Sequence, residues 1–125
     1  MYIADPRQVP QGIFAYTLHP TRLGMLTEGA TAEERALAGE HWAYSRDLLA
    51  RDVVIFGGRT VSPTADSFAL VVIRAPSLDA ARAIAANDPA VRGGVFRAMV
   101  YPYQPMLMGA WPSEAAISTE SASTA

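Results

Sequence analysis

The sequence contains no cysteine, and this absence removes several chemistries at once. Disulfides, thiolate nucleophiles and cysteine-bound metals all need a residue that the chain does not have. Lysine is also absent, so all 10 basic residues are arginines, against 12 acidic residues and a formal net charge of −2. The arginines stand singly along the chain, for example Arg22, Arg46, Arg74 and Arg97. We therefore expect no nucleic acid partner, because such binding requires a clustered basic surface.

Long hydrophobic runs are lacking too. The longest unbroken apolar run, Phe68 to Ile73, is far shorter than the roughly 20 residues of a membrane-spanning helix. Since no basic start followed by an apolar stretch opens the chain, we expect a cytoplasmic protein with no membrane partner. The composition, 50% hydrophobic and 18% charged, is typical of a globular protein. The length of 125 residues is enough for one domain with a single core.

Periodicity and breaker residues predict six main elements in a recognisable order. The expected strands cover residues 12–18, 53–56, 67–74 and 95–104, and the expected helices cover residues 32–51 and 78–86. The order β-α-β-β-α-β is that of a ferredoxin-like α+β domain. Its four-stranded antiparallel sheet carries two helices on one face.

Several of these elements have terminal signals. The run Thr31-Ala32-Glu33-Glu34 has capping-box spacing, and Ser77 is the expected N-cap of the second helix. Asn87 is the expected left-handed cap at the end of that helix, where Pro89 prevents its continuation. Gly57-Gly58 is expected to end the second strand.

The remaining segments are assigned by composition. Residues 1–11 are expected to form an N-terminal arm, residues 12–108 the domain, and the Ala-, Ser-, Thr- and Glu-rich residues 109–125 a disordered tail. His19-Pro20 is expected to end the first strand, because proline cannot extend a central ladder. The loop that follows, to Ala30, is longer than most connections, and loops of this length tend to be either functional or disordered.

The strands predict a second apolar face on the sheet. In the third expected strand Phe68, Leu70 and Val72 alternate with Ala69, Val71 and Ile73, so both faces are apolar. An antiparallel sheet with one face in water should instead alternate apolar with polar residues. An apolar face of this size rarely stays exposed. We therefore expect a homodimer whose two sheets stack face to face about a two-fold axis.

His41 and Asp88 are the candidate catalytic residues. A neutral imidazole is the side chain best suited to moving protons near neutral pH, and a nearby carboxylate can accept its N–H and fix its tautomer. Each residue also has a structural interpretation. His41 can be a core histidine bonded to backbone, and an Asp before Pro after a helix is ordinary turn chemistry.

Arginines and tyrosines are the candidates for substrate binding. An arginine fork suits a carboxylate or another anionic oxygen, and a tyrosine ring can line a pocket. The alternatives are solvated surface charges for the arginines and core positions for the tyrosines. The candidates are Arg22, Arg59, Arg92, Tyr16, Tyr44 and Tyr101.

Other site chemistries lack their motifs. His19 and His41, the two histidines, show no close metal-ligand spacing, so no metal is expected. The pairs Gly57-Gly58 and Gly93-Gly94 match neither a dinucleotide fingerprint nor a P-loop, and no Gly-x-Ser-x-Gly elbow occurs. We therefore expect no cofactor.

Several short segments occur with the order and spacing of a known family. They are His41-Trp42-Ala43-Tyr44, Leu48-Leu49, Val54-Ile55-Phe56-Gly57-Gly58, Ser77-Leu78-Asp79-Ala80-Ala81, Asn87-Asp88-Pro89, Gly94-Val95-Phe96 and Val100-Tyr101-Pro102-Tyr103. In them, over about residues 12–105, the chain resembles the YciI-like (YCII-related) family of the dimeric α/β-barrel superfamily. The chain departs from the family pattern at Ala38-Gly39-Glu40, where a basic residue and a proline commonly precede the histidine.

The resemblance implies a ferredoxin-like fold, dimerisation through the sheets, and a His–Asp pair at a pocket between helices and sheet. By motif the pair is His41 and Asp88. The characterised relatives that the resemblance suggests are a dehydrochlorinase acting on a chlorinated hydroxyquinol and, more distantly, muconolactone isomerases. Both transfer protons on small oxygenated rings.

Two functions from different classes remain open. The first is a small cofactor-free lyase- or isomerase-like enzyme, with His41 as general base and acid, Asp88 orienting it, and Arg22 or Arg59 binding an anionic oxygen of a small-molecule substrate. The second is a non-catalytic dimeric module that binds a small ligand. If His41 and Asp88 are purely structural, their substitution should lower stability and nothing else.

Overall fold

A four-stranded antiparallel sheet forms the centre of the molecule. The computed structural model describes residues 2–3 and 12–112, and of these residues 12–103 belong to one compact unit. The strand order is β3-β4-β2-β5. The four strands are β2 (Ile13–Pro20), β3 (Val54–Arg59), β4 (Ala69–Arg74) and β5 (Phe96–Pro102).

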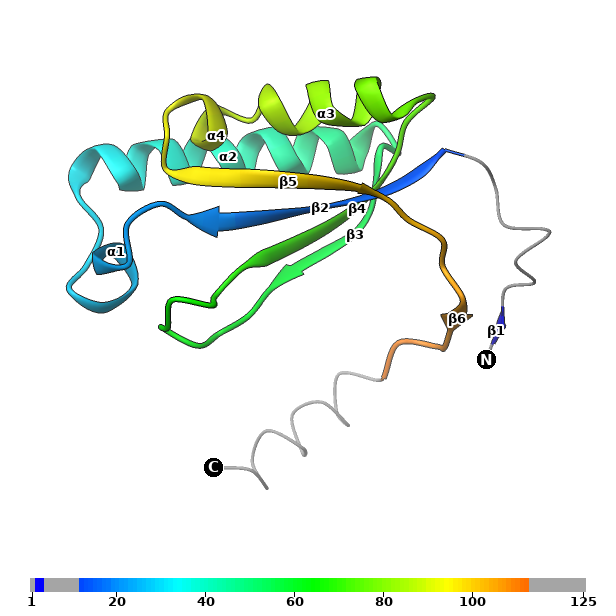
Figure 1. Cartoon of the computed structure of the whole chain (residues 1–125), viewed down its shortest axis with the longest axis horizontal. Coiled ribbons are helices and arrows are strands. Elements are labelled where there is room, and N and C mark those ends of the chain that lie inside the picture. The colour runs from blue at the N-terminus through cyan, green and yellow to red at the C-terminus, as the bar shows by residue number, and fades with distance from the viewer. Residues whose placement is uncertain (1, 4–11, 113–125) are drawn as a thin grey trace. The chain divides into compact units, whose positions relative to one another are not determined.

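Two helices cover one face of this sheet (Figure 1). They are α2 (Ala32–Ala50) and α3 (Leu78–Ala86), and the single-turn helices α1 (Gly24–Thr27) and α4 (Pro89–Arg92) lie in the connections. The order of the main elements and the strand order confirm the predicted ferredoxin-like α+β fold. No helix in the part of the chain that the structure describes is long and apolar enough to cross a membrane.

The predicted N-caps are confirmed, and Asn87 is the C-cap of α3 as predicted, but its predicted left-handed conformation is wrong. The capping box of Thr31 and Glu34 is complete, and the Ser77 side chain accepts a hydrogen bond from the Ala80 amide. Asn87 has a φ of −84° and is not left-handed. The chain turns there because Asp88 leaves the helix in an extended conformation and Pro89 begins α4.

Three segment boundaries differ from the sequence prediction. Strand β2 continues through Pro20, which pairs with β5 alone, so the missing N–H of proline breaks no ladder on the other side. Strand β3 continues through Gly57-Gly58, since backbone pairing with β4 does not depend on a side chain. The loop after β2 contains α1.

The described residues outside this unit, 2–3 and 104–112, belong to a second unit, which was not predicted to contain strands. Strand β1 (Tyr2–Ile3) pairs antiparallel with β6 (Leu107–Met108). Two-residue strands are too short to show a period in the sequence, and residues 1–11 were expected to be an arm only. The predicted disorder of residues 109–125 lies, from residue 113 onward, outside the described residues.

Strand alternation separates the side chains of the sheet into two sets. Phe14, Tyr16 and Leu18 point toward the helices and pack with Leu48 and Ala81 in the main core. The other face carries a second, smaller cluster. Its members are Ile13, Ala15, Val72 and the partly buried Leu70. Both faces are therefore apolar in their centre, as the sequence predicted.

Candidate functional site

Asp88 is a fully buried carboxylate that has two protein partners. Its exposed fraction is 0%, and its Oδ1 accepts a hydrogen bond from the Ala90 amide at 2.9 Å as the N-cap of α4. Its Oδ2 lies 2.5 Å from Nδ1 of His41. A buried charge is costly unless it is paired and hydrogen-bonded, and these two contacts supply both. The turn role and the pairing role suggested by the sequence therefore coexist in one residue.

His41 reaches Asp88 from the middle of α2. Its side chain is 19% exposed, and its ring packs edge-on against Phe96 with centroids 5.3 Å apart. Because Nδ1 is used by Asp88, the second nitrogen, Nε2, remains. Nε2 has no hydrogen-bond partner among the described residues. An imidazole held in this way has one oriented nitrogen and one nitrogen available to a ligand.

A pocket of about 450 Å³ opens beside His41, between α2 and the edge strand β3. The residues from α2 recur at helical spacing and are Ala38, His41, Trp42, Ser45, Arg46 and Leu49. The sheet contributes Val54, Phe56, Gly57, Gly58, Arg59, Ala69, Val71 and Phe96. Gly57 pairs with Val71 on the face toward α2, and its lack of a side chain leaves room there.

Arg59 is the one predicted binding residue that lines this pocket. It pairs with Ala69, which also lines the pocket, and it stands at the end of β3. Trp42 and Arg46 also line the pocket, although the sequence did not single them out as site residues. Their signal was present: Trp42, Ser45, Arg46 and Leu49 continue from His41 along one side of the helix. The Ser45 hydroxyl is buried and has no hydrogen-bond partner in the described part of the chain.

Arg22 is engaged elsewhere, contrary to its predicted role. Its guanidinium forms a two-point contact with Glu34 at 3.0 and 2.6 Å and also donates to the Gly29 carbonyl. Arg22, followed by the Thr31 amide, lowers the pKa of Glu34 to about 2. The sequence could not show this because Glu34 serves both as the capping-box residue and as the partner of Arg22. Arg22 thus ties the segment around α1 to the start of α2.

The tyrosine candidates are not brought into the pocket. Tyr44 packs in the core and donates its hydroxyl to the Ile84 carbonyl at 2.7 Å. Tyr101 alternates with Val100, so it lies on the sheet face away from the helices, where its hydroxyl contacts Met99. Tyr16 is fully buried in the main core.

Asp88 influences two of these phenols electrostatically. Burial first, and then the charge of Asp88, raise the pKa of Tyr16 and of Tyr44. Both groups therefore stay protonated at neutral pH. The Tyr16 hydroxyl has no hydrogen-bond partner among the described side chains and backbone groups.

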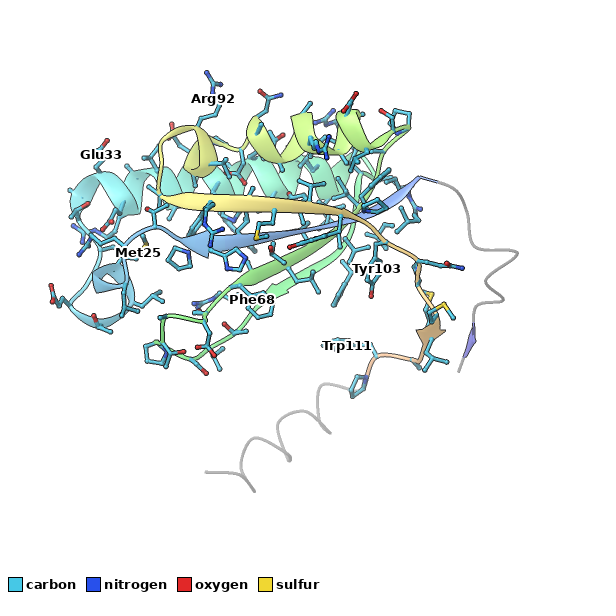
Figure 2. The ribbon with its side chains drawn as sticks, in the orientation of Figure 1. Met25, Glu33, Phe68, Arg92, Tyr103 and Trp111 are labelled. Carbon is cyan, nitrogen blue, oxygen red and sulfur yellow. The ribbon has the colours of Figure 1, made fainter. Side chains whose placement is uncertain are left out.

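The second histidine is not part of this arrangement. His19 lies on the opposite face of the sheet, where it contacts the Thr17 hydroxyl at 2.9 Å and stacks on Phe68. Figure 2 shows Phe68 on the side of the sheet away from the helices. Residues 2–3 and 12–112 contain no group of three or more histidine and carboxylate side chains that could hold a metal ion.

The fold and this geometry define a ferredoxin-like α+β domain with a buried His–Asp pair beside an open pocket. The chain belongs to the YCII-related domain family, which matches residues 19–104. The family prediction is thereby confirmed, and no protein among the curated sequences matches the chain.

Among the solved structures with the same fold is the 5-chloro-2-hydroxyhydroquinone dehydrochlorinase (TftG) from Burkholderia phenoliruptrix AC1100, in complex with 2,5-dihydroxybenzoquinone. The similarity has a TM-score of 0.53 at 20% sequence identity and covers 73% of this chain and 93% of that chain. At this identity the likeness concerns the fold.

Proposed function

We propose that the protein is a small-molecule enzyme of the lyase or isomerase type, with His41 as its general base and acid. One observation carries the proposal: the imidazole is fixed through Nδ1 by a buried carboxylate, while its other nitrogen has no partner among residues 2–3 and 12–112 and the ring lines a pocket. Asp88 then serves as a positioning residue. It holds the tautomer in which Nε2 carries a lone pair, and it stabilises the imidazolium formed after proton transfer.

The proposed reaction needs only side-chain acid–base chemistry. Nε2 of His41 removes a proton from an acidic C–H or O–H of an oxygenated substrate, and the electron pair of that bond stays on the substrate. The resulting enolate or phenolate is stabilised by the positive charge of the pocket, to which Arg59 contributes. The electron pair then either expels a leaving anion, which is an elimination, or takes the proton back at another atom, which is an isomerisation. General acid–base catalysis contributes about 10²–10⁴-fold.

The similar solved structure supports the elimination branch. Its name describes the loss of hydrogen chloride from a chlorinated hydroxyhydroquinone, and its ligand is a small oxygenated ring. Elimination releases a proton and an anion. His41 can accept the proton, and the positive charge of Arg59 favours departure of the anion. The pocket volume of about 450 Å³ is sufficient for one such ring.

Turnover with matched histidine variants tests this function. Chlorinated hydroxyhydroquinones and enol lactones would be assayed by chloride release and by ultraviolet absorbance. We expect His41→Gln to abolish turnover and Asp88→Asn to reduce kcat at least about 100-fold. The control is His19→Gln, on the opposite face of the sheet, which should retain activity.

Two results would contradict the proposal. If ligands bind to wild type and to His41→Gln equally and neither protein turns them over, the pocket belongs to a non-catalytic binding module. If no such ligand binds and both substitutions at His41 and Asp88 only lower the unfolding temperature, the pair is structural.

A further inference from the structure

Three arginines lack partners in the described part of the chain. Arg46, Arg59 and Arg92 have neither an ion pair nor a side-chain hydrogen bond with a described residue. Two of the three, Arg46 and Arg59, line the same pocket as His41. Arg92 extends from α4 away from the sheet, as Figure 2 shows. Unpaired positive charge is therefore concentrated at the pocket.

The two pocket arginines come from opposite walls. Arg46 lies on α2, five residues after His41, and Arg59 ends the edge strand β3 on the side of the sheet that faces α2. No carboxylate is among the described residues that line the pocket. The pocket thus presents two guanidinium groups and no acidic side chain to compensate them, which favours an anionic ligand.

The rest of the opening is apolar and aromatic. Trp42 is 63% exposed and lines the pocket. An exposed large ring at a pocket entrance offers a flat surface for a planar molecule. No helix N-terminus contributes to the lining, since the α2 residues come from the interior of that helix, so the backbone N–H groups typical of phosphate sites are missing there.

We propose that Arg46 and Arg59 form a carboxylate subsite, and that the substrate class is therefore planar organic acids. The carboxylate is held between the two arginine forks, the planar part lies against Trp42, and the reacting end faces Nε2 of His41. The placement of the reacting end beside Nε2 of His41 rests on the proposed function. The carboxylate subsite does not rest on it, because the subsite depends only on charge and on the shape of the pocket.

Isothermal titration calorimetry with two matched probes tests the subsite. The probes are 2,5-dihydroxybenzoate and hydroquinone, which share the ring and two hydroxyls and differ in the carboxylate. We expect the acid to bind at least about 10-fold more tightly than hydroquinone. Arg46→Met and Arg59→Met should each weaken binding of the acid about 10-fold and leave hydroquinone unchanged. The control Arg92→Met removes the same charge from α4 and should change both affinities less than 2-fold.

The outcomes separate the subsite from the proposed function. Equal binding of the two probes, or equal effects of the Arg46→Met and Arg92→Met substitutions, would overturn the subsite even if His41-dependent turnover is found. Tighter binding of phenyl phosphate than of benzoate would overturn the carboxylate assignment and show that the subsite prefers a phosphate. Arginine-dependent binding of the acid without any turnover would uphold the subsite and contradict the enzyme.

Discussion

Nδ1 of His41 lies 2.5 Å from Oδ2 of Asp88, a residue 47 positions further along the chain. His41 comes from the helix of the first β-α-β half, and Asp88 follows the helix of the second half. The pair therefore exists only when both halves of the fold have assembled. The same carboxylate caps α4, so the local turn and the long-range contact depend on each other.

The tautomer of His41 follows from this contact. A carboxylate accepts hydrogen bonds only, so neutral His41 should carry its proton on Nδ1. Asparagine has one acceptor oxygen for two donors, the Ala90 amide and the imidazole, so Asp88→Asn should populate the Nε2–H form. Long-range ¹H–¹⁵N NMR distinguishes the two tautomers, with His19 as internal control. A protonated Nε2 in neutral wild-type His41 would contradict the assignment.

Removal of the Asp88 side chain, the buried N-cap of α4, should lower the free energy of unfolding more than removal of an exposed cap does. Asp88→Ala leaves both the Ala90 amide and the His41 N–H without their acceptor, so we expect a loss of about 3 kcal/mol in the free energy of unfolding. The matched control is Ser77→Ala at the exposed cap of α3, for which about 1 kcal/mol is expected. Urea denaturation measures both values. Equal losses would show that the histidine contact adds nothing to stability.

The Arg22–Glu34 pair predicts a specific pH dependence. Arg22 lowers the pKa of Glu34 from 4.5 to about 2, so the folded state binds fewer protons than the unfolded state between these values. The stabilisation is therefore complete above about pH 4.5 and is lost as the pH falls toward 2. Glu34→Gln should destabilise the protein at pH 7, and its difference from wild type should vanish near pH 2. Thermal unfolding across this range measures the difference.

Glu33→Gln is the control for that experiment. Glu33 lies in the same first turn of α2, makes no ion pair with a described residue, and projects outward in Figure 2. It should show little difference from wild type at either pH. A Glu34→Gln effect that is independent of pH would mean that the hydrogen-bond geometry, and not the charge, stabilises the α1 segment.

Filling the gap at Gly57 should close the pocket without unfolding the sheet. A Cβ placed on Gly57 would lie 3.4 Å from the Leu70 carbonyl oxygen, and a valine suits a strand. We expect Gly57→Val to weaken binding of 2,5-dihydroxybenzoate more than 10-fold while the unfolding temperature stays within a few degrees. Gly58→Val is the control: Gly58 lines the pocket through its backbone alone, and a side chain added there would project from the opposite face of β3 into open space. Equal binding in both variants would place the ligand elsewhere.

The apolar sheet face away from the helices predicts a homodimer. Met99 and Tyr101 are 39% and 43% exposed on that face, beside the cluster of Ile13, Ala15 and Val72. Such a face rarely stays in water. We expect wild type to sediment as a dimer, Met99→Arg to sediment as a monomer, and Val61→Arg, in the exposed hairpin loop, to leave the dimer intact. A monomeric wild type would contradict the prediction.

The architecture was predictable because its signals are local. Side-chain period, the Thr31 capping box and the Ser77 cap each specify an element within a few residues. The errors have local causes as well. Gly57-Gly58 looked like a strand end, yet pairing with β4 continues through it, and Asn87 needed no left-handed conformation because Asp88 turns the chain.

The site was predictable only in part, because partner choice is a property of the folded chain. The sequence pointed to His41 and Asp88, and the structure brings them into contact. The sequence did not distinguish Arg22 from Arg59 as binding candidates. In the structure Arg22 is paired with Glu34, whereas Arg59 lines the pocket. Arg46 was read only as one of several scattered charges, since nothing in the sequence shows which arginines remain unpaired.

Because β3 lies at the edge of the sheet, substitutions in this strand can change the pocket without changing the His41–Asp88 contact. Strand β3 has a single neighbour, β4, and none of its residues touches the His41–Asp88 hydrogen bond. Replacements at Gly57 or Arg59 therefore alter what the pocket admits and leave the His41–Asp88 contact in place. A lineage built on this fold can acquire new ligands by changes along one outer strand while that contact is retained.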